Sequence, residues 1–197
     1  AYFHTYPNAF MSDQTTFIRE SDGRLRNDTM PINGYGNMTI DKIVYYHASD
    51  VEAGSSNSGI DLTALSRYVQ PDDGNVHDRT LLYVPLPQAV APNEQALFVI
   101  NFTVELPYAF ARMGAVDDFV MAGQWHPKIS VYETAGMRSR EEEGWNMHQY
   151  HGNSEFYANF GTYQVQVDVP SDYIVAASGH EFRPAEQSRD KTRKVRS

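Results

Sequence analysis

The sequence contains no cysteine. This absence excludes disulfide bonds, cysteine-ligated zinc and thiol catalysis from the chain. Basic residues are also few, because 16 Lys and Arg stand against 25 Asp and Glu, for a net charge of −9 and a pI near 5.1. A nucleic-acid-binding surface needs clustered Lys and Arg. We therefore expect no nucleic-acid partner.

Long apolar runs are missing as well. No run approaches the roughly 18 residues that a helix needs to span a bilayer, so no membrane segment is expected. A signal-peptide pattern is also missing, since the chain opens on AYFHTYPNAF, which looks like the middle of a fold. The single basic cluster is RDKTRKVRS, residues 189–197. Phosphate or lipid headgroups would suit it, but a solvated linker is the simpler interpretation.

Aromatic residues, in contrast, are abundant: the chain has 13 Tyr, 10 Phe and 2 Trp among 197 residues. Hydrophobic residues make up 41% of the sequence. A chain of this size can bury about 70% of its unfolded surface without disulfide or metal cross-links. The composition therefore predicts a folded chain rather than a disordered one.

The dominant hydrophobic period is two, which is typical of strands with one buried face. It is clearest in QALFVINFTVELP (95–107) and TYQVQVDVP (162–170), and MTIDKIVYYH, RTLLYVPLP, HPKISVYE and DYIVAASG are further strand candidates. Helical patterns are short, at 11–20 and 61–69. We expect a mainly β, antiparallel sandwich or large sheet with little helix. It should form a single domain over residues 1–182, followed by a linker at 183–197.

The densest polar stretch is EEEGWNMHQYHGNSEFY, residues 141–157. His148 and His151 would share a face only on a helix, whereas the surrounding Gly and Asn residues favour irregular backbone. A zinc site needs three or four ligands at workable spacing, and the side chains of three adjacent glutamates diverge. A zinc site and an acid/base pair stay open, but a solvated connection between strands is the favoured interpretation.

Known catalytic motifs are incomplete. His180-Glu181 begins a zincin-like H-E-x-x-H, but Pro184 occupies the position where the second histidine is needed. Asp117-Asp118 is the most plausible carboxylate pair, although adjacent side chains normally point apart. From the residues alone, the chain is an acidic β domain without a self-contained active site.

A resemblance to a known family covers nearly the whole chain up to about residue 182. It is carried by LPYAFARMG, AGQWHPKISVYE and GWNMHQYHGNSEFYANFGTYQVQVDVPSDYIVAASG, preceded in the same order by FHTYPNAF and PLPQAVAPNEQALFVINFTVELP. These segments resemble the N-terminal β domain of zinc aminopeptidase-like metallopeptidases. The relatives are gluzincins related to alanyl aminopeptidase and leukotriene A4 hydrolase, particularly the large bacterial members.

The resemblance implies a saddle-like β domain that packs on a separate catalytic domain of the same polypeptide. In the family that other domain carries zinc, H-E-x-x-H and G-x-M-E-N. Neither motif occurs in this chain, so zinc is expected only in the absent domain and no cofactor in this one. The first hairpin of the relatives also has no counterpart here. The chain alone is therefore expected not to be an enzyme, although the parent protein is expected to be one.

Site residues follow from the same resemblance. Relatives use one polar residue, on a loop shortly before the segment that matches QWHPK, to help hold the free amino group of a peptide substrate. In this sequence the candidates are Asp117, Asp118 and Gln124, because a protonated amine needs a fixed acceptor. Five further residues form the structural motif of the resemblance, with Trp145 and Tyr157 as packing anchors: Trp125, Pro127, Trp145, Phe156 and Tyr157.

Two functions remain open at this level. The first is a noncatalytic N-terminal domain of a zinc-dependent aminopeptidase-like enzyme, which helps to shape the pocket for the substrate amino terminus. The alternative is a stand-alone β-sandwich that binds peptide or carbohydrate through aromatic and acidic surface.

Overall fold

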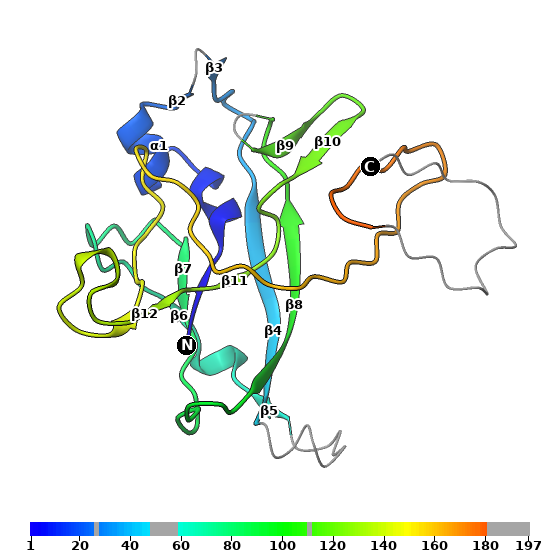
Figure 1. Cartoon of the computed structure of the whole chain (residues 1–197). Helices are drawn as coiled ribbons and strands as arrows, with labels where there is room; N and C mark the ends of the chain where they lie inside the picture. Colours follow the sequence, from blue (N-terminus) through cyan, green and yellow to red (C-terminus); the bar gives the residue numbers. More distant parts are fainter. Residues whose placement is uncertain (26–27, 48–58, 110–111, 181–197) are drawn as a thin grey trace, which may run out of the picture. The chain divides into compact units, whose positions relative to one another are not determined.

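The computed structural model describes residues 1–25, 28–47, 59–109 and 112–180 (Figure 1). The chain divides into two compact units, Ala1–Asn159 and Phe160–Ser197. No pattern in the sequence predicts this division. The linker expected at 183–197 lies outside the described residues.

Two sheets form the centre of the first unit. One has four strands in the order β11 (Lys128–Ile129), β1 (Tyr2–His4), β7 (Leu81–Tyr83) and β6 (Arg67–Tyr68). The other has three strands in the order β5 (Ile60–Asp61), β4 (Asn37–His47) and β8 (Ala96–Glu105). All pairings within these sheets are antiparallel. The expected mainly β fold with little helix is confirmed.

Three two-stranded ladders and four short helical segments complete the described elements. The ladders are β2 (Arg24–Leu25) with β3 (Asp28–Thr29), β9 (Met113–Val116) with β10 (Phe119–Ala122), and β12 (Tyr132–Glu133) with β13 (Gly144–Trp145). The α-helix α1 spans Thr16–Ser21, and the 3-10 helices are η1 (Tyr6–Phe10), η2 (Thr63–Leu65) and η3 (Met137–Ser139).

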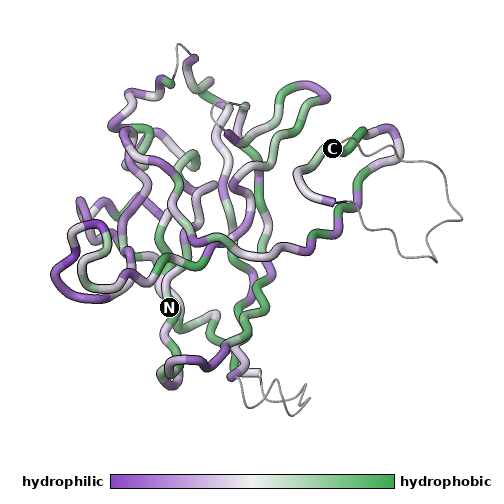
Figure 2. Tube along the Cα trace, viewed as in Figure 1, coloured by the Kyte–Doolittle hydropathy of each residue, from purple (hydrophilic) through white to green (hydrophobic). Residues whose placement is uncertain are grey.

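The longest ladder joins β8, where the alternation in the sequence is among the clearest, to β4, which is a further strand candidate. Their register runs from Asn37 opposite Glu105 to His47 opposite Ala96, with an irregularity between Ile40 and Lys42. Along β8 every even position is half-buried and every odd position is exposed, as the alternation in the sequence predicts. Hydrophobic residues recur along both strands in Figure 2.

A hydrophobic core lies between the two sheets. Phe3 on β1 packs edge-on against Phe98 of β8, with ring centroids 5.1 Å apart, and Phe98 also contacts Tyr45 of β4. The buried members of this core are Phe3, Ile43, Tyr45, Leu62, Leu82 and Val84. Because each sheet presents its apolar face to the other, the two pack as a sandwich.

A second core lies under α1 and η1. Its buried members are Tyr6, Ala9, Phe10, Phe17, Ile18, Met30, Met113 and Tyr150. The helix α1 ends at Asp22, whose left-handed backbone (φ 52°) closes the last turn. Tyr150 stacks on Phe17 at 5.1 Å and on Phe156 at 4.7 Å, so the stretch after β13 covers this core.

Three predicted elements differ from the structure. Residues 61–69 form η2 and β6 rather than a two-turn helix, because Arg67 and Tyr68 pair with β7. The segments TYQVQVDVP and DYIVAASG are not strands. Tyr163, Val165 and Val167 are 61%, 56% and 50% exposed, and the described part of the second unit contains no strand ladder. An alternating pattern becomes a strand only where another strand satisfies its backbone groups.

Candidate functional site

Polar side chains gather where three segments of the first unit meet: α1, the turn at 71–74 and the connection 146–157 that follows β13. The connection is irregular backbone, as its Gly and Asn residues predict. We call this group the polar seam, and its members are Glu20, Asp72, Asp73, His148, Gln149 and His151. Residues about 50 and 130 positions apart in the sequence thus meet at one place.

His151 is held between two carboxylates. Its Nδ1 lies 2.8 Å from Oε1 of Glu20, and its Nε2 lies 3.0 Å from Oδ2 of Asp72. Burial acts to lower the pKa of His151, but hydrogen bonds and the negative charges of Glu20 and Asp72 outweigh it and raise that pKa above 6.5. With both nitrogens engaged, the ring is arranged to keep a proton rather than to transfer one.

Asp72 collects several donors from the connection. Its Oδ2 accepts the backbone N–H of Gln149 at 2.7 Å, and its Oδ1 lies 2.9 Å from Nδ1 of His148. Burial acts to raise the pKa of Asp72, but hydrogen bonds from His151, Gln149 and His148 lower it below its usual 3.8. Asp72 is therefore a charged acceptor over the whole neutral and mildly acidic range.

Gln149, only 4% exposed, is the buried centre of the polar seam. Its Nε2 donates to Oδ1 of Asp73 at 2.9 Å and to Oγ1 of Thr16 at 3.2 Å, while its Oε1 accepts the backbone N–H of Asp72 at 3.2 Å. The amide is thus bonded on both sides. Gln149 fixes the register of the connection against the turn.

Asp78 supports the same region, and among the described residues it forms no ion pair. Its Oδ1 accepts from both the backbone N–H and the hydroxyl of Thr80, and its Oδ2 accepts the backbone N–H of Thr16 at the start of α1. Burial raises the pKa of Asp78, although these hydrogen bonds act in the opposite direction. The carboxyl group is structural, since its hydrogen bonds stabilise the first turn of α1.

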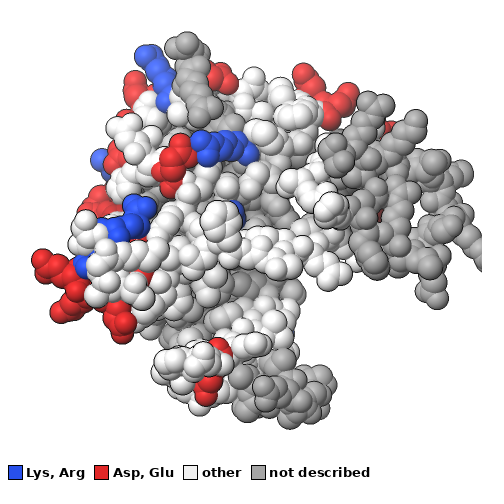
Figure 3. All heavy atoms as spheres, viewed as in Figure 1, with Lys and Arg blue, Asp and Glu red and all other residues white. Residues whose placement is uncertain are grey.

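A second polar cluster surrounds Glu133 on β12. The Glu133 side chain is 3% exposed, and it accepts hydrogen bonds from Nη1 of Arg140 at 3.1 Å and from Nδ2 of Asn146 at 3.3 Å. Burial acts to raise the pKa of Glu133, but the hydrogen bonds, first that from Arg140, lower it below 4.5. The cluster closes the loop between β12 and β13. Exposed acidic residues Glu141, Glu142 and Glu143 lie on this loop, and Figure 3 shows acidic side chains gathered at that edge.

The structure does not bring the three predicted substrate-binding residues together. Asp117 and Asp118 are exposed and form the two-residue tip of the β9–β10 hairpin. Gln124 lies two residues beyond the other end of β10. At about 3.3 Å per residue, this places it more than about 10 Å from the tip. Gln124 is half-buried, and its Oε1 is buried without a hydrogen-bond partner among the described residues.

The structural motif residues pack in three separate places. Trp125 is half-buried beside Phe102, with ring centroids 5.9 Å apart. The carbonyl oxygen of Pro127 lies 3.0 Å from Nδ1 of His126. Trp145 contacts Tyr2 and Tyr132. Phe156 packs on Tyr6 and Tyr150, and Tyr157 is bonded through its backbone to the Tyr6 hydroxyl.

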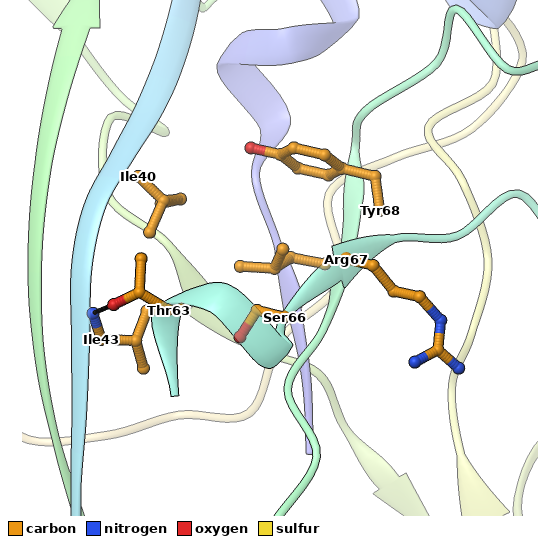
Figure 4. A pocket seen from close by; sticks show the side chains of 7 residues that line it. Ile40, Ile43, Thr63, Ser66, Arg67 and Tyr68 are labelled. Carbon is orange, nitrogen blue, oxygen red and sulfur yellow. Dashed lines mark hydrogen bonds between the residues drawn. The ribbon is translucent and has the colours of Figure 1, made fainter. Parts of the chain in front are cut away.

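A small pocket of about 120 Å³ lies between β4 and the η2–β6 segment (Figure 4). Ile40, Ile43 and Leu82 supply apolar walls. Thr63 accepts the backbone N–H of Ile43 through its hydroxyl, and the Ser66 hydroxyl donates to the carbonyl of Leu62. The guanidinium of Arg67 extends away from the other lining side chains. The pocket therefore offers mostly apolar contact to any occupant.

The described residues contain no group of three or more His, Asp or Glu side chains with a geometry that could hold a metal ion. In the polar seam, both His151 nitrogens face carboxylate oxygens. Among the same residues, none of the helices is long and apolar enough to cross a membrane.

The histidines of the polar seam stand out in the sequence, but their partners do not. In the sequence, Asp72 and Asp73 stand in the turn-like stretch QPDDGN (70–75), and Glu20 stands at the end of the short helical pattern 11–20. Paired acids in a Gly- and Pro-containing turn are a signal for an exposed acceptor. No sequence pattern showed that the turn would meet residues 148–151.

No protein-family model, no curated protein and no solved structure matches the chain.

Proposed function

We propose that the chain is the noncatalytic N-terminal domain of a zinc-dependent aminopeptidase-like metallopeptidase. In this role it packs on a catalytic domain of the same polypeptide and helps to shape the pocket for the substrate amino terminus. The proposal begins from the combination of QWHPK, Gly144-Trp145 and Glu155-Phe156-Tyr157 in the sequence. In the structure these residues act as packing and hydrogen-bonding elements of the β unit, as a supporting domain requires.

The observation that carries the proposal is an apolar outer face on the three-stranded sheet. Leu97 and Val99 of β8 are each 45% exposed. They lie opposite Tyr46 and Val44 of β4 in the register of the sheet, on the face away from the core residue Tyr45. Adjacent apolar side chains facing outward on neighbouring strands are typical of a surface that meets another protein surface.

The first test is the mass of the native gene product, by immunoblot with an antibody against this domain. A band several times heavier than 22.3 kDa is expected. The immunoprecipitated product should also hydrolyse an aminoacyl reporter substrate in a chelator-sensitive way. The isolated chain should not hydrolyse it. A native band at the mass of the chain itself would contradict the proposal.

A matched pair of variants tests the apolar face in the native protein. Val99→Lys places a charge at the centre of that face, and we expect it to lower reporter hydrolysis and the apparent melting temperature. Thr103→Lys places the same charge further along the same exposed side of β8 and should leave both nearly unchanged. Equal effects of the two variants would argue against this face as the contact surface.

A second candidate function, a stand-alone module that binds peptide or carbohydrate, is favoured by one observation. Four rings form a continuous strip across β7, β1, β13 and β12, in the order Tyr83, Tyr2, Trp145 and Tyr132, with centroids 5.0, 6.2 and 5.4 Å apart. The guanidinium of Arg67 lies 4.5 Å from the Tyr83 ring at one end. Large rings of this kind supply ligand contact area at low entropic cost.

Binding measurements on the isolated chain separate the two candidates. If the chain is a stand-alone module, it should bind a member of an oligosaccharide or peptide array in a saturable way. Trp145→Ala should then weaken binding at least about tenfold, whereas Trp125→Ala, a half-buried tryptophan outside the strip, should not. The absence of saturable binding would exclude this candidate.

A further inference from the structure

We propose that His151 is a pH-sensitive latch. Its protonated ring fastens the connection 146–157 to α1 and to the turn at Asp72, and loss of the proton loosens that attachment. The inference concerns the first unit alone and does not depend on the proposed function.

The two ring contacts of His151 require a protonated imidazole. Both Nδ1 and Nε2 lie within 3.0 Å of a carboxylate oxygen, from Glu20 and Asp72 respectively. A neutral imidazole has one N–H and one lone pair, whereas the imidazolium has two N–H donors. When the proton leaves, one ring nitrogen therefore turns a lone pair toward a negatively charged oxygen. One of the two hydrogen bonds is lost and replaced by repulsion.

The same two carboxylates also hold the backbone of the connection. Oε2 of Glu20 accepts the N–H of Gly152 at 2.8 Å, and Oδ2 of Asp72 accepts the N–H of Gln149 at 2.7 Å. A cation between the carboxylates keeps both in position for these backbone donors. Deprotonation of His151 consequently weakens four hydrogen bonds, all accepted by the carboxylates of Glu20 and Asp72, rather than a single side-chain contact.

Each element that packs against His151 contributes a charged or titratable group. Glu20 comes from α1, Asp72 and Asp73 come from the turn, and His148 comes from the connection itself. Three carboxylates thus face two imidazoles, so the local field favours the proton on His151. His148 has a single contact, to Asp72, and its side chain is 66% exposed, which makes it a secondary member.

The direction of the switch follows from linkage. Because the folded pKa of His151 lies above its unfolded value of 6.5, the stabilisation from the latch is complete below pH 6.5 and is lost as the pH rises through the folded pKa. On the acid side, Asp72 keeps its charge to below pH 3.8 because its own pKa is lowered. The latch is therefore closed in mildly acidic solution and open in alkaline solution.

Loss of the His151 proton would affect the backbone of the connection as well as the His151 ring. Tyr150 and Phe156 flank the latch in the connection, and both pack on the core under α1. Gln149, in the same stretch, is anchored by Asp72 and Asp73. We expect release to loosen the backbone between Gln149 and Ser154 while the apolar anchors Tyr150 and Phe156 keep the connection attached.

Two NMR measurements on the intact chain test the proposal. The ¹⁵N shifts of the His151 ring report its protonation directly, and both nitrogens should show the imidazolium signature at pH 6.5. Hydrogen-exchange protection of the Gly152 and Gln149 amides should fall about fivefold to tenfold as the ring titrates. Protection of the Tyr45 amide in β4, corrected for intrinsic exchange, should stay constant over the same range.

Variants identify the group responsible. His151→Gln offers only a neutral amide and should show low protection of Gly152 at every pH, without a step. His148→Gln should keep the step. A neutral His151 ring at pH 6.5 in the unmodified chain would overturn the proposal, even if His151→Gln failed to fold. A protonated ring whose titration leaves the protection of Gly152 unchanged would overturn it as well.

Discussion

Two histidines of the first unit are held in opposite protonation states by their surroundings. His151 faces carboxylates that raise its pKa. His4, on β1, is 2% exposed, and neither ring nitrogen has a hydrogen-bond partner among the described residues. Burial first, and the charge of His148 second, lower the pKa of His4 to about 4. The His4 ring, stacked on Tyr6 at 5.0 Å, is thus neutral in the fold.

Replacing His4 tests this assignment. Between pH 6.5 and 4 the unfolded chain binds a proton at His4 more readily than the folded chain, so stability falls as the pH falls through this window. The difference between a pKa of 6.5 and one of about 4 corresponds to about 3 kcal/mol once the pH is below 4. In urea denaturation at pH 7 and pH 4.5, His4→Phe should lose about 2 kcal/mol less than the unmodified chain. His77→Phe, at an exposed site, should show no such difference. Equal acid losses in all three proteins would contradict the assignment.

Glu133 is the clearest case of a buried carboxylate stabilised by its partners. Glu133→Gln removes the charge that faces Arg140 while keeping the shape of the side chain, and we expect a loss of about 2 kcal/mol in the free energy of unfolding. Because the pKa of Glu133 is lowered, this contribution is present above pH 4.5 and is lost as the pH falls through the folded pKa. Glu142→Gln, on the exposed part of the same loop, should change stability by less than about 0.5 kcal/mol. A similarly small effect of Glu133→Gln would show that the cluster contributes little.

At the scale of elements, short hairpins are positioned by the backbone conformation of their turns. The β9–β10 hairpin reverses over Asp117 and Asp118, and only Asp117 has a positive φ, of 49°. A left-handed residue other than glycine carries a steric cost, which aspartate tolerates better than most residues. Turn formation therefore accounts for an aspartate at position 117.

The two aspartates should respond in opposite ways to glycine. Asp117→Gly relieves the left-handed conformation and should leave stability unchanged or raise it by up to about 1 kcal/mol. Asp118→Gly adds only unfolded-state freedom and should cost about 0.5–1 kcal/mol. Chemical denaturation of both variants gives the comparison. A loss from Asp117→Gly as large as that from Asp118→Gly would show that the aspartate side chain stabilises the turn by another route.

At the scale of the whole molecule, contacts between distant parts of the sequence close the first unit. The Tyr6 hydroxyl donates to the carbonyl of Tyr157 at 3.2 Å and accepts its N–H at 3.1 Å, across 151 positions of sequence. The polar seam joins α1 and the turn to the same connection. Together these contacts hold the connection against segments formed much earlier in the chain.

Removing one oxygen tests how much this closure contributes. Tyr6→Phe keeps the ring contacts with Tyr150 and Phe156 but leaves both backbone groups of Tyr157 without their partner. We expect a loss of about 1–3 kcal/mol in the free energy of unfolding. Tyr83→Phe, on the partly exposed outer side of β7, serves as the control and should cost less than about 0.5 kcal/mol. A Tyr6→Phe loss as small as the control would mean that water replaces the hydroxyl at this site.

Local sequence patterns predicted the elements that follow from the order of apolar and polar residues within one segment. β8 follows directly from apolar residues at every second position, and the irregular connection at 146–157 follows from its Gly and Asn residues. Residues 163–169 show the limit of such patterns. Their alternation is as regular as that of β8, yet they form no strand, because pairing depends on a neighbouring strand that the pattern does not specify.

The sequence by itself determined a mainly β chain with little helix, an acidic charge balance, and the absence of cysteine chemistry. These properties depend on composition and on contacts between near neighbours. Only the tertiary structure decided that His151 lies between Glu20 and Asp72, that Asp117 and Asp118 form a hairpin tip away from Gln124, and that the His4 ring is buried with no hydrogen-bond partner among the described residues. Each of these depends on which distant segments the packing of two cores brings together, and the protonation of both histidines is a consequence of that packing.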